Sequence, residues 1–180
     1  MLFYLPALLW DPRLKHISNN RELTKTAPLL VFPVNKLNVS DTAVAMHHYF
    51  YYPYSSKNLK TLIFNNSVNP FTSKMLKSSS IEKLVFRNSR FGATNLNTNR
   101  QVTHLDVQGC EFDGALWQGS PTLKYLNIAF TDFSDFKALT AYSNLDTLVI
   151  SDSVGIPDEI INTMKSQGTK VDIKRNHETH

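Results

Sequence analysis

One spaced pattern recurs six times in this chain of 180 residues and constrains its fold more than any other feature. Each unit reads apolar-x-x-apolar-x-apolar, followed three positions later by a small hydroxyl or thiol residue, and successive units begin 21 to 25 residues apart. The six units are Val34, Leu37, Val39, Thr42; Leu59, Leu62, Phe64, Ser67; Ile81, Leu84, Phe86, Ser89; Val102, Leu105, Val107, Cys110; Leu123, Leu126, Ile128, Thr131; and Leu145, Leu148, Ile150, Ser153. Self-similarity at such a period indicates a solenoid, a stack of repeating structural units.

The pattern predicts one short β-strand in each unit. Alternation of apolar and polar residues, as in Leu126-Asn127-Ile128, is the period of a strand with one buried face. A strand this short cannot bury its apolar side alone, so stacking on the next unit must complete the core and align the strands in parallel. A degenerate seventh unit follows, in which Gly168, Val171 and Ile173 take the same three places.

The small residue after each strand has a structural explanation. The chain must turn there, which leaves interior backbone N–H and C=O groups without sheet partners, and a hydroxyl can bind them. Cys110 takes this place in the fourth unit, so we expect a buried, structural thiol and not a reactive one. Two positions further on, Phe91, Phe112 and Phe133 predict a spine of packed rings.

On these residues the chain resembles the leucine-rich repeat superfamily, whose units carry L-x-x-L-x-L-x-x-[N/C]-x-L. The resemblance runs from about Val34 to Ile173, with Ser, Thr or Cys in place of the usual asparagine. It implies an α/β fold: a leucine-rich repeat solenoid, or curved horseshoe, of about six to seven repeats with a parallel β-sheet on its concave face. It also implies protein recognition as the usual role.

Three segments are expected. Residues 1–33 form an N-terminal cap, residues 34–173 form the solenoid, and residues 174–180 form a flexible tail. Within the solenoid, Ile156 to Gln167 predicts a C-terminal capping helix, because Pro157 suits a first turn and Gly168 suits a stop. The strand that follows closes the stack.

Cysteine content and hydropathy favour a cytoplasmic protein. A single cysteine cannot form an internal disulfide, which suits a reducing compartment. The apolar opening Leu2 to Trp10 lacks the basic region and cleavage site of a signal peptide, and no stretch reaches the roughly 18 apolar residues of a membrane span. We therefore expect no membrane span.

Strand periodicity places the third, fifth and seventh residues of each unit on the face opposite the core. Tyrosine and arginine are frequent hot-spot residues at protein interfaces, and apolar residues between them supply contact area. The candidate partner-binding residues are Lys36, Lys83, Val85, Arg87, His104, Asp106, Tyr125 and Asn127. The alternative is that this face is only solvated and that a partner docks elsewhere.

A second candidate surface is the aromatic patch Tyr49, Tyr51, Tyr52 and Tyr54 in the longest repeat. Tyrosines offer rigid contact area, although the same residues could seal the first repeat against the cap. Residues 1–90 hold twelve Lys or Arg against four Asp or Glu, whereas residues 91–180 hold seven against eleven. The basic half leaves nucleic-acid or polyanion binding as an alternative function, and an uneven but merely solvated surface as the simplest reading.

No catalytic motif is present: the chain lacks G-x-S-x-G, a P-loop, H-E-x-x-H and Cys-x-x-Cys. His104 and Asp106 share one strand face without a nucleophile in view, and the pairs His47-His48 and His177/His180 lack a third metal ligand. The sequence therefore predicts a non-catalytic protein–protein interaction module, a scaffold, adaptor or effector type of domain. It predicts no cofactor and no metal.

Overall fold

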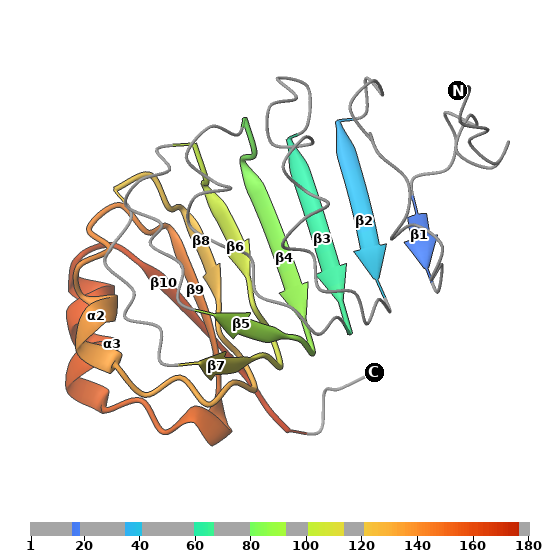
Figure 1. Cartoon of the computed structure of the whole chain (residues 1–180). Helices are drawn as coiled ribbons and strands as arrows, with labels where there is room; N and C mark the ends of the chain where they lie inside the picture. The colour runs from blue at the N-terminus through green and yellow to red at the C-terminus, as the bar shows by residue number, and fades with distance from the viewer. Residues whose placement is uncertain are drawn as a thin grey trace, which may run out of the picture.

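The fold is α/β, and its main element is a parallel β-sheet whose strands lie in chain order (Figure 1). The computed structural model describes residues 16–18, 35–40, 60–66, 80–92, 101–113 and 121–176. In these ranges eight strands form the sheet: β1 (His16–Ser18), β2 (Lys36–Ser40), β3 (Thr61–Asn65), β4 (Lys83–Arg87), β6 (His104–Asp106), β8 (Tyr125–Asn127), β9 (Thr147–Ser151) and β10 (Lys170–Lys174). The smaller elements are the paired strands β5 (Arg90–Gly92) and β7 (Glu111–Asp113), the helices α2 (Phe136–Leu139) and α3 (Asp158–Ser166), and the 3-10 helix η6 (Asp152–Val154).

The strand pairing follows the sequence repeat. Each unit contributes one strand, and the middle apolar residue of each unit lies opposite that of the next, as Leu84 does with Leu105 and Leu105 with Leu126. At the other end Val171 pairs with Leu148 and Ile173 with Ile150, so the degenerate seventh unit is a true strand in the expected register. The prediction of one parallel strand per unit is confirmed.

The core lies under one face of this sheet. In the first six units, fourteen of the predicted inward positions have described side chains, and all are 5% exposed or less. Neighbouring units pack their rings together, since Phe64 stacks on Phe86 with centroids 5.2 Å apart. Burial of a large apolar side chain contributes roughly 1.5–3 kcal/mol, so the buried inward residues of the repeat units are the main source of stability among the described residues.

After each strand the backbone makes a left-handed turn at the same position in four successive units. The residues with positive φ are Asn66 (51°), Asn88 (48°), Gly109 (67°) and Phe130 (58°). The backbone N–H of each of these residues donates to the next unit: to Arg87 O, Gln108 O and Ala129 O in the first three, and to Ser151 Oγ in the fourth. This row of bonds extends the parallel pairing past the strand ends.

The predicted hydroxyl positions take part in these turns, with one exception. Ser89 Oγ donates to Arg87 O at 2.9 Å, Thr131 Oγ1 donates to Ile128 O at 2.7 Å, and the Cys110 thiol donates to Phe86 O at 3.2 Å. The prediction that these small residues bind turn carbonyls is confirmed at these three sites. It is wrong for the exposed Ser153, whose hydroxyl meets Ser151 Oγ because η6 replaces the turn there. Thr42 and Ser67 lie outside the described residues.

The capping helix is present, and the predicted aromatic spine is confirmed for the Phe112 and Phe133 rings. Phe91 lies opposite Phe112 in the β5–β7 pair, and Phe112 meets Phe133 edge-on at 5.4 Å. Helix α3 begins after Pro157, buries Met164 and ends at Ser166, two residues before Gly168, which has φ 91°. Bonds from Gly168 N to Lys165 O and from Thr169 N to Met164 O close its last turn, which is the Schellman arrangement.

The chain ends differ from the expected segments in two ways. Strand β1 lies within the expected cap and pairs with β2, which the sequence did not predict; the remainder of residues 1–33 is outside the described ranges. Lys174, placed at the start of the tail, is the last residue of β10. Figure 1 shows β10 at one end of the sheet, with α2 and α3 beside it. No helix in the described ranges is long and apolar enough to span a membrane.

Gly109 should tolerate a side chain less well than another left-handed glycine in the chain. A Cβ at Gly109 would lie 2.3 Å from Asn88 Oδ1, whereas a Cβ at Gly155, with nearly the same φ of 65°, would meet nothing within 4 Å. We expect Gly155→Ala to lower the free energy of unfolding by about 1 kcal/mol, and Gly109→Ala by at least 1 kcal/mol more. Urea unfolding of both variants measures the difference, and equal losses would show that the Asn88 contact is unimportant.

Candidate functional site

The face of the sheet opposite the core carries the predicted partner-binding residues. We call it the polar face; it consists of the third, fifth and seventh positions of the units. Lys83 pairs in register with His104, and His104 with Tyr125, while Val85, Asp106 and Asn127 form a parallel row beside them. The structure thus brings the eight candidates onto one face. Their surroundings divide that face into two unlike halves.

The half over β6, β8 and β9 is closed by its own contacts. Asp106 is 2% exposed and Asn127 is 1% exposed, although the sequence placed both on an accessible surface. Each accepts a bond from the backbone two residues on: Gln108 N donates to Asp106 Oδ1 at 3.2 Å, and Ala129 N donates to Asn127 Oδ1 at 3.1 Å. These two side chains hold the ends of their strands and present no free group to a partner.

Arg87 is bound to this closed half. Its Nε donates to Asp106 Oδ2 at 3.0 Å and its Nη2 donates to the same oxygen, while about half of the Arg87 side chain stays exposed. The carboxylate is therefore fully used, with Oδ2 on the guanidinium and Oδ1 on the backbone. Arg87 was predicted as a partner-binding residue of a hot-spot type. Because it is paired with Asp106, removal of Arg87 would also leave a buried carboxylate without its cation.

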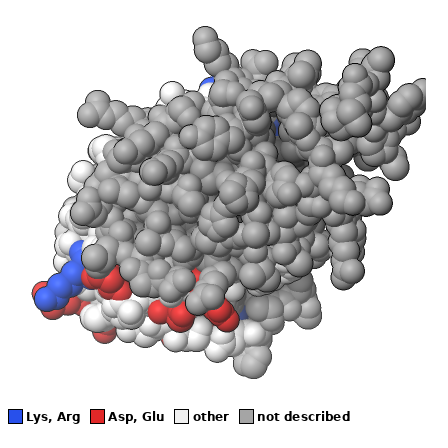
Figure 2. Space-filling view, viewed as in Figure 1, with Lys and Arg blue, Asp and Glu red and all other residues white. Residues whose placement is uncertain are grey.

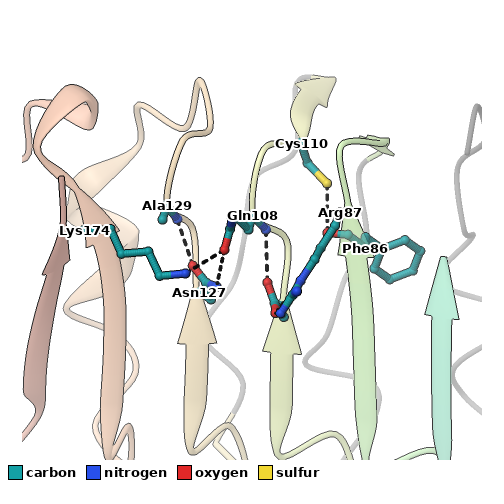
Figure 3. A network of polar contacts seen from close by, with 8 residues as sticks. Phe86, Arg87, Gln108, Cys110, Asn127, Ala129 and Lys174 are labelled. Atoms are coloured by element: carbon teal, nitrogen blue, oxygen red, sulfur yellow. Dashed lines mark hydrogen bonds and ion pairs between the residues drawn. The ribbon is translucent and has the colours of Figure 1, made fainter. Parts of the chain in front are cut away.

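A long-range contact crosses the same half of the face. Lys174, at the end of β10, donates through Nζ to Gln108 Oε1 at 2.7 Å, and Asn127 Nδ2 donates to the same oxygen at 3.3 Å. Figure 3 shows these three side chains converging across the strands, with Arg87 nearby. Because three strand spacings of about 4.8 Å separate β6 from β10, Lys174 spans the C-terminal half of the polar face.

The rings of His104 and Tyr125 stack face to face. Their centroids are 4.0 Å apart and the rings are 3° from parallel. Partial burial, together with the charge of Lys83, lowers the pKa of His104 from 6.5 to about 4, and Asp106 only partly offsets this. The imidazole is therefore neutral at physiological pH. Neither ring offers both faces to a ligand.

The open half of the polar face is a cavity of about 400 Å³ over β2, β3 and β4. It is lined by Lys36, Thr61, Ile63, Asn65, Lys83, Val85 and Arg87. Its floor is apolar, because Ile63 and Val85 are direct neighbours in the sheet register; Val85, which the sequence placed on an accessible surface, is only 6% exposed, so Ile63 is the more accessible of the two. We call this cavity the β2–β4 pocket. Four of the eight predicted residues line this pocket, namely Lys36, Lys83, Val85 and Arg87.

Two of the three cationic residues that line the pocket lack an ionic partner in the described ranges, whereas Arg87 is paired with Asp106. None of the described lining residues is acidic, and in the described ranges neither Lys36 nor Lys83 forms an ion pair. Other described lysines do have partners: Lys60 pairs with Glu82, and Lys124 with Asp146. Figure 2 shows acidic side chains along the lower left edge of the molecule, with a basic side chain beside them at its left end.

Other candidate chemistry is absent from the described part of the chain or lies outside it. The described ranges contain no group of three His, Cys, Asp or Glu residues that could hold a metal. Burial raises the pKa of the Cys110 thiol to about 12, which keeps it protonated. The aromatic patch Tyr49, Tyr51, Tyr52 and Tyr54, and the pairs His47-His48 and His177/His180, are outside the described residues.

Comparison of the chain with protein-family models, with curated proteins and with solved structures found no match. Arguments about function therefore depend on the repeat, the sheet and the pocket.

Proposed function

We propose that this chain is a non-catalytic protein-recognition module built as a leucine-rich repeat type of solenoid. Two features support this architecture: the repeat extends over six units, and every described strand of the main sheet adds to its neighbour in parallel and in register. Such a stack presents a continuous face whose shape depends little on any one side chain. The polar face is the concave side in this proposal.

The observation that carries the proposal is the β2–β4 pocket. It combines an apolar floor at Ile63 and Val85 with cationic walls at Lys36 and Lys83, on rigid strands and not on loops. Interfaces between proteins use this combination of a desolvated apolar centre and a charged rim. His104, the only described histidine on this face near an acid, is stacked on Tyr125 and is neutral, which supports a binding role over acid–base catalysis.

A cytoplasmic location belongs to the same proposal. It is supported by the one cysteine of the chain, which is buried as a free thiol in the core and needs no oxidising compartment.

Filling the pocket should abolish partner capture. Thr61 lies between Lys36 and Lys83 in the sheet register and faces the pocket, so Thr61→Trp adds bulk there without changing charge. Tryptophan is also tolerated in strands. In affinity capture from the native source, we expect Thr61→Trp to lose more than tenfold of each specific partner, as read by quantitative mass spectrometry.

The matched control is Asn162→Trp, which places the same side chain on the exposed surface of α3. It should retain every partner captured by the unaltered chain, and both variants should unfold at the same temperature. Equal capture by all three proteins would remove the polar face from the proposal. Salt-sensitive capture of RNA or DNA in place of proteins would favour the polyanion alternative.

A further inference from the structure

We propose that the β2–β4 pocket binds an acidic, extended segment of a partner protein, with carboxylate side chains on Lys36 and Lys83 and an apolar side chain on Ile63 and Val85. This inference deepens the proposed function and rests on it. It names the chemistry of the partner at the open part of the polar face that the described residues form.

Charge complementarity is the first argument. Lys36 and Lys83 stand two strand spacings apart, about 10 Å, on either side of Thr61. Both line the same cavity, and no described acidic residue neutralises either one. Burial is the main cause of the low pKa of the adjacent His104; the positive charges of Lys83 and Arg87 lower it further, and Asp106 raises it. An anionic group in this pocket would be drawn in by both lysines.

The type of anion follows from the donors that remain free. Bidentate recognition of phosphate favours the planar fork of arginine, but two nitrogens of Arg87 are already bound to Asp106. Lysine ammonium groups act as point charges, which a single carboxylate can satisfy without a bidentate fork. Nucleic acid would also need exposed stacking surfaces, and the described aromatic pair on this face, His104 and Tyr125, is stacked on itself.

The shape of the pocket favours an extended peptide. Lys83, Val85 and Arg87 project from one strand at alternate positions, so cationic, apolar and cationic groups follow one another along β4. An extended peptide has the same two-residue period, and its first, third and fifth side chains share one face. A segment with an acidic and an apolar residue at that spacing is therefore complementary to Lys83 and Val85, and Lys36, two strands away, can take a second acidic side chain.

The test is an NMR titration of the full chain with the peptide acetyl-Glu-Thr-Leu-Thr-Glu-amide. We expect saturable shifts in the His104 and Val85 signals, together with a rise in the His104 pKa, because the added negative charge stabilises the imidazolium. The variant Lys36→Gln/Lys83→Gln should bind at least fivefold more weakly. The control variant Lys137→Gln/Lys165→Gln removes the same charge from exposed positions on α2 and α3 and should bind normally.

Parallel titrations identify the source of binding. The neutral peptide acetyl-Gln-Thr-Leu-Thr-Gln-amide, inorganic phosphate and a single-stranded oligothymidylate should each leave the His104 pKa unchanged at equal ionic strength. Equal binding of the neutral peptide, stronger binding of phosphate or oligothymidylate, or no response to the acidic peptide would each overturn this inference. If Thr61→Trp still abolished partner capture in that case, the recognition function would stand and only its acidic ligand would be wrong.

Discussion

Leu126→Ala is expected to lower the free energy of unfolding by about 2–5 kcal/mol. Leu126 is fully buried and lies between Leu105 and Leu148 in the sheet register, so its truncation opens a cavity against two neighbouring units. Interior packing is dense, and the strands on either side cannot close onto the missing volume without breaking their own pairing. Urea denaturation followed by circular dichroism measures the loss.

The matched control is Ile173→Ala. Ile173 occupies a core-facing position of the seventh unit, but it is 53% exposed because β10 is the last strand of the sheet and no further described unit covers it. The same kind of truncation should therefore cost less than about 1 kcal/mol. If Ile173→Ala were as damaging as Leu126→Ala, the stack would have to continue past β10, and the core would not end where the described strands end.

The contrast between Leu126 and Ile173 shows how much of the fold a sequence pattern can predict. Apolar periodicity identifies which residues face the core, because each apolar side chain must leave water and the strand period decides its direction. It identified the strands from β2 to β10 in the main sheet and their register, including the degenerate seventh unit. It does not reveal how completely each residue is covered, since coverage depends on the neighbouring unit.

The left-handed turns illustrate a signal that was present but incomplete. Asn66, Asn88 and Gly109 are residue types that adopt positive φ at low cost, and they recur at the repeat spacing. Phe130 adopts the same positive φ although phenylalanine does not favour it, so the fourth turn could not be predicted from residue type. Its N–H still reaches Ser151 Oγ, which indicates that the stacked units impose the conformation on Phe130.

The candidate site was only partly accessible to sequence reasoning, for a related reason. Periodicity placed Asp106, Asn127, Lys36 and Lys83 on one face and gave no basis for separating them. Asp106 is buried where it accepts from Arg87 of the neighbouring unit, and Asn127 is buried where it donates to Gln108, which also accepts from Lys174, 66 residues later in the chain. A repeat pattern predicts features that all units share, whereas the bond between Lys174 and Gln108 is made by two side chains that do not recur in the other units.

Asp106→Ala should cost about 2–3 kcal/mol of unfolding free energy, whereas Asp106→Asn should cost less than about 1 kcal/mol. Alanine removes the acceptor for Gln108 N and for two nitrogens of Arg87. The ion pair itself contributes only part of this, because Arg87 is half exposed and stays solvated when its partner is lost. Asparagine keeps an oxygen for Gln108 N, as Asn127 already does for Ala129 N at the equivalent position of the next unit.

Asn127 shows that asparagine can make this contact in the same fold. Chemical denaturation of the two Asp106 variants distinguishes stabilisation by the bond from Gln108 N from stabilisation by the ion pair with Arg87. A large loss in Asp106→Ala with a small loss in Asp106→Asn would mean that the backbone bond at the end of β6 is the main stabilising contact. Equal large losses would instead assign the stability to the charge pair with Arg87. In that case Arg87 could not move to meet a ligand, and the β2–β4 pocket would depend on Lys36 and Lys83 alone for its charge.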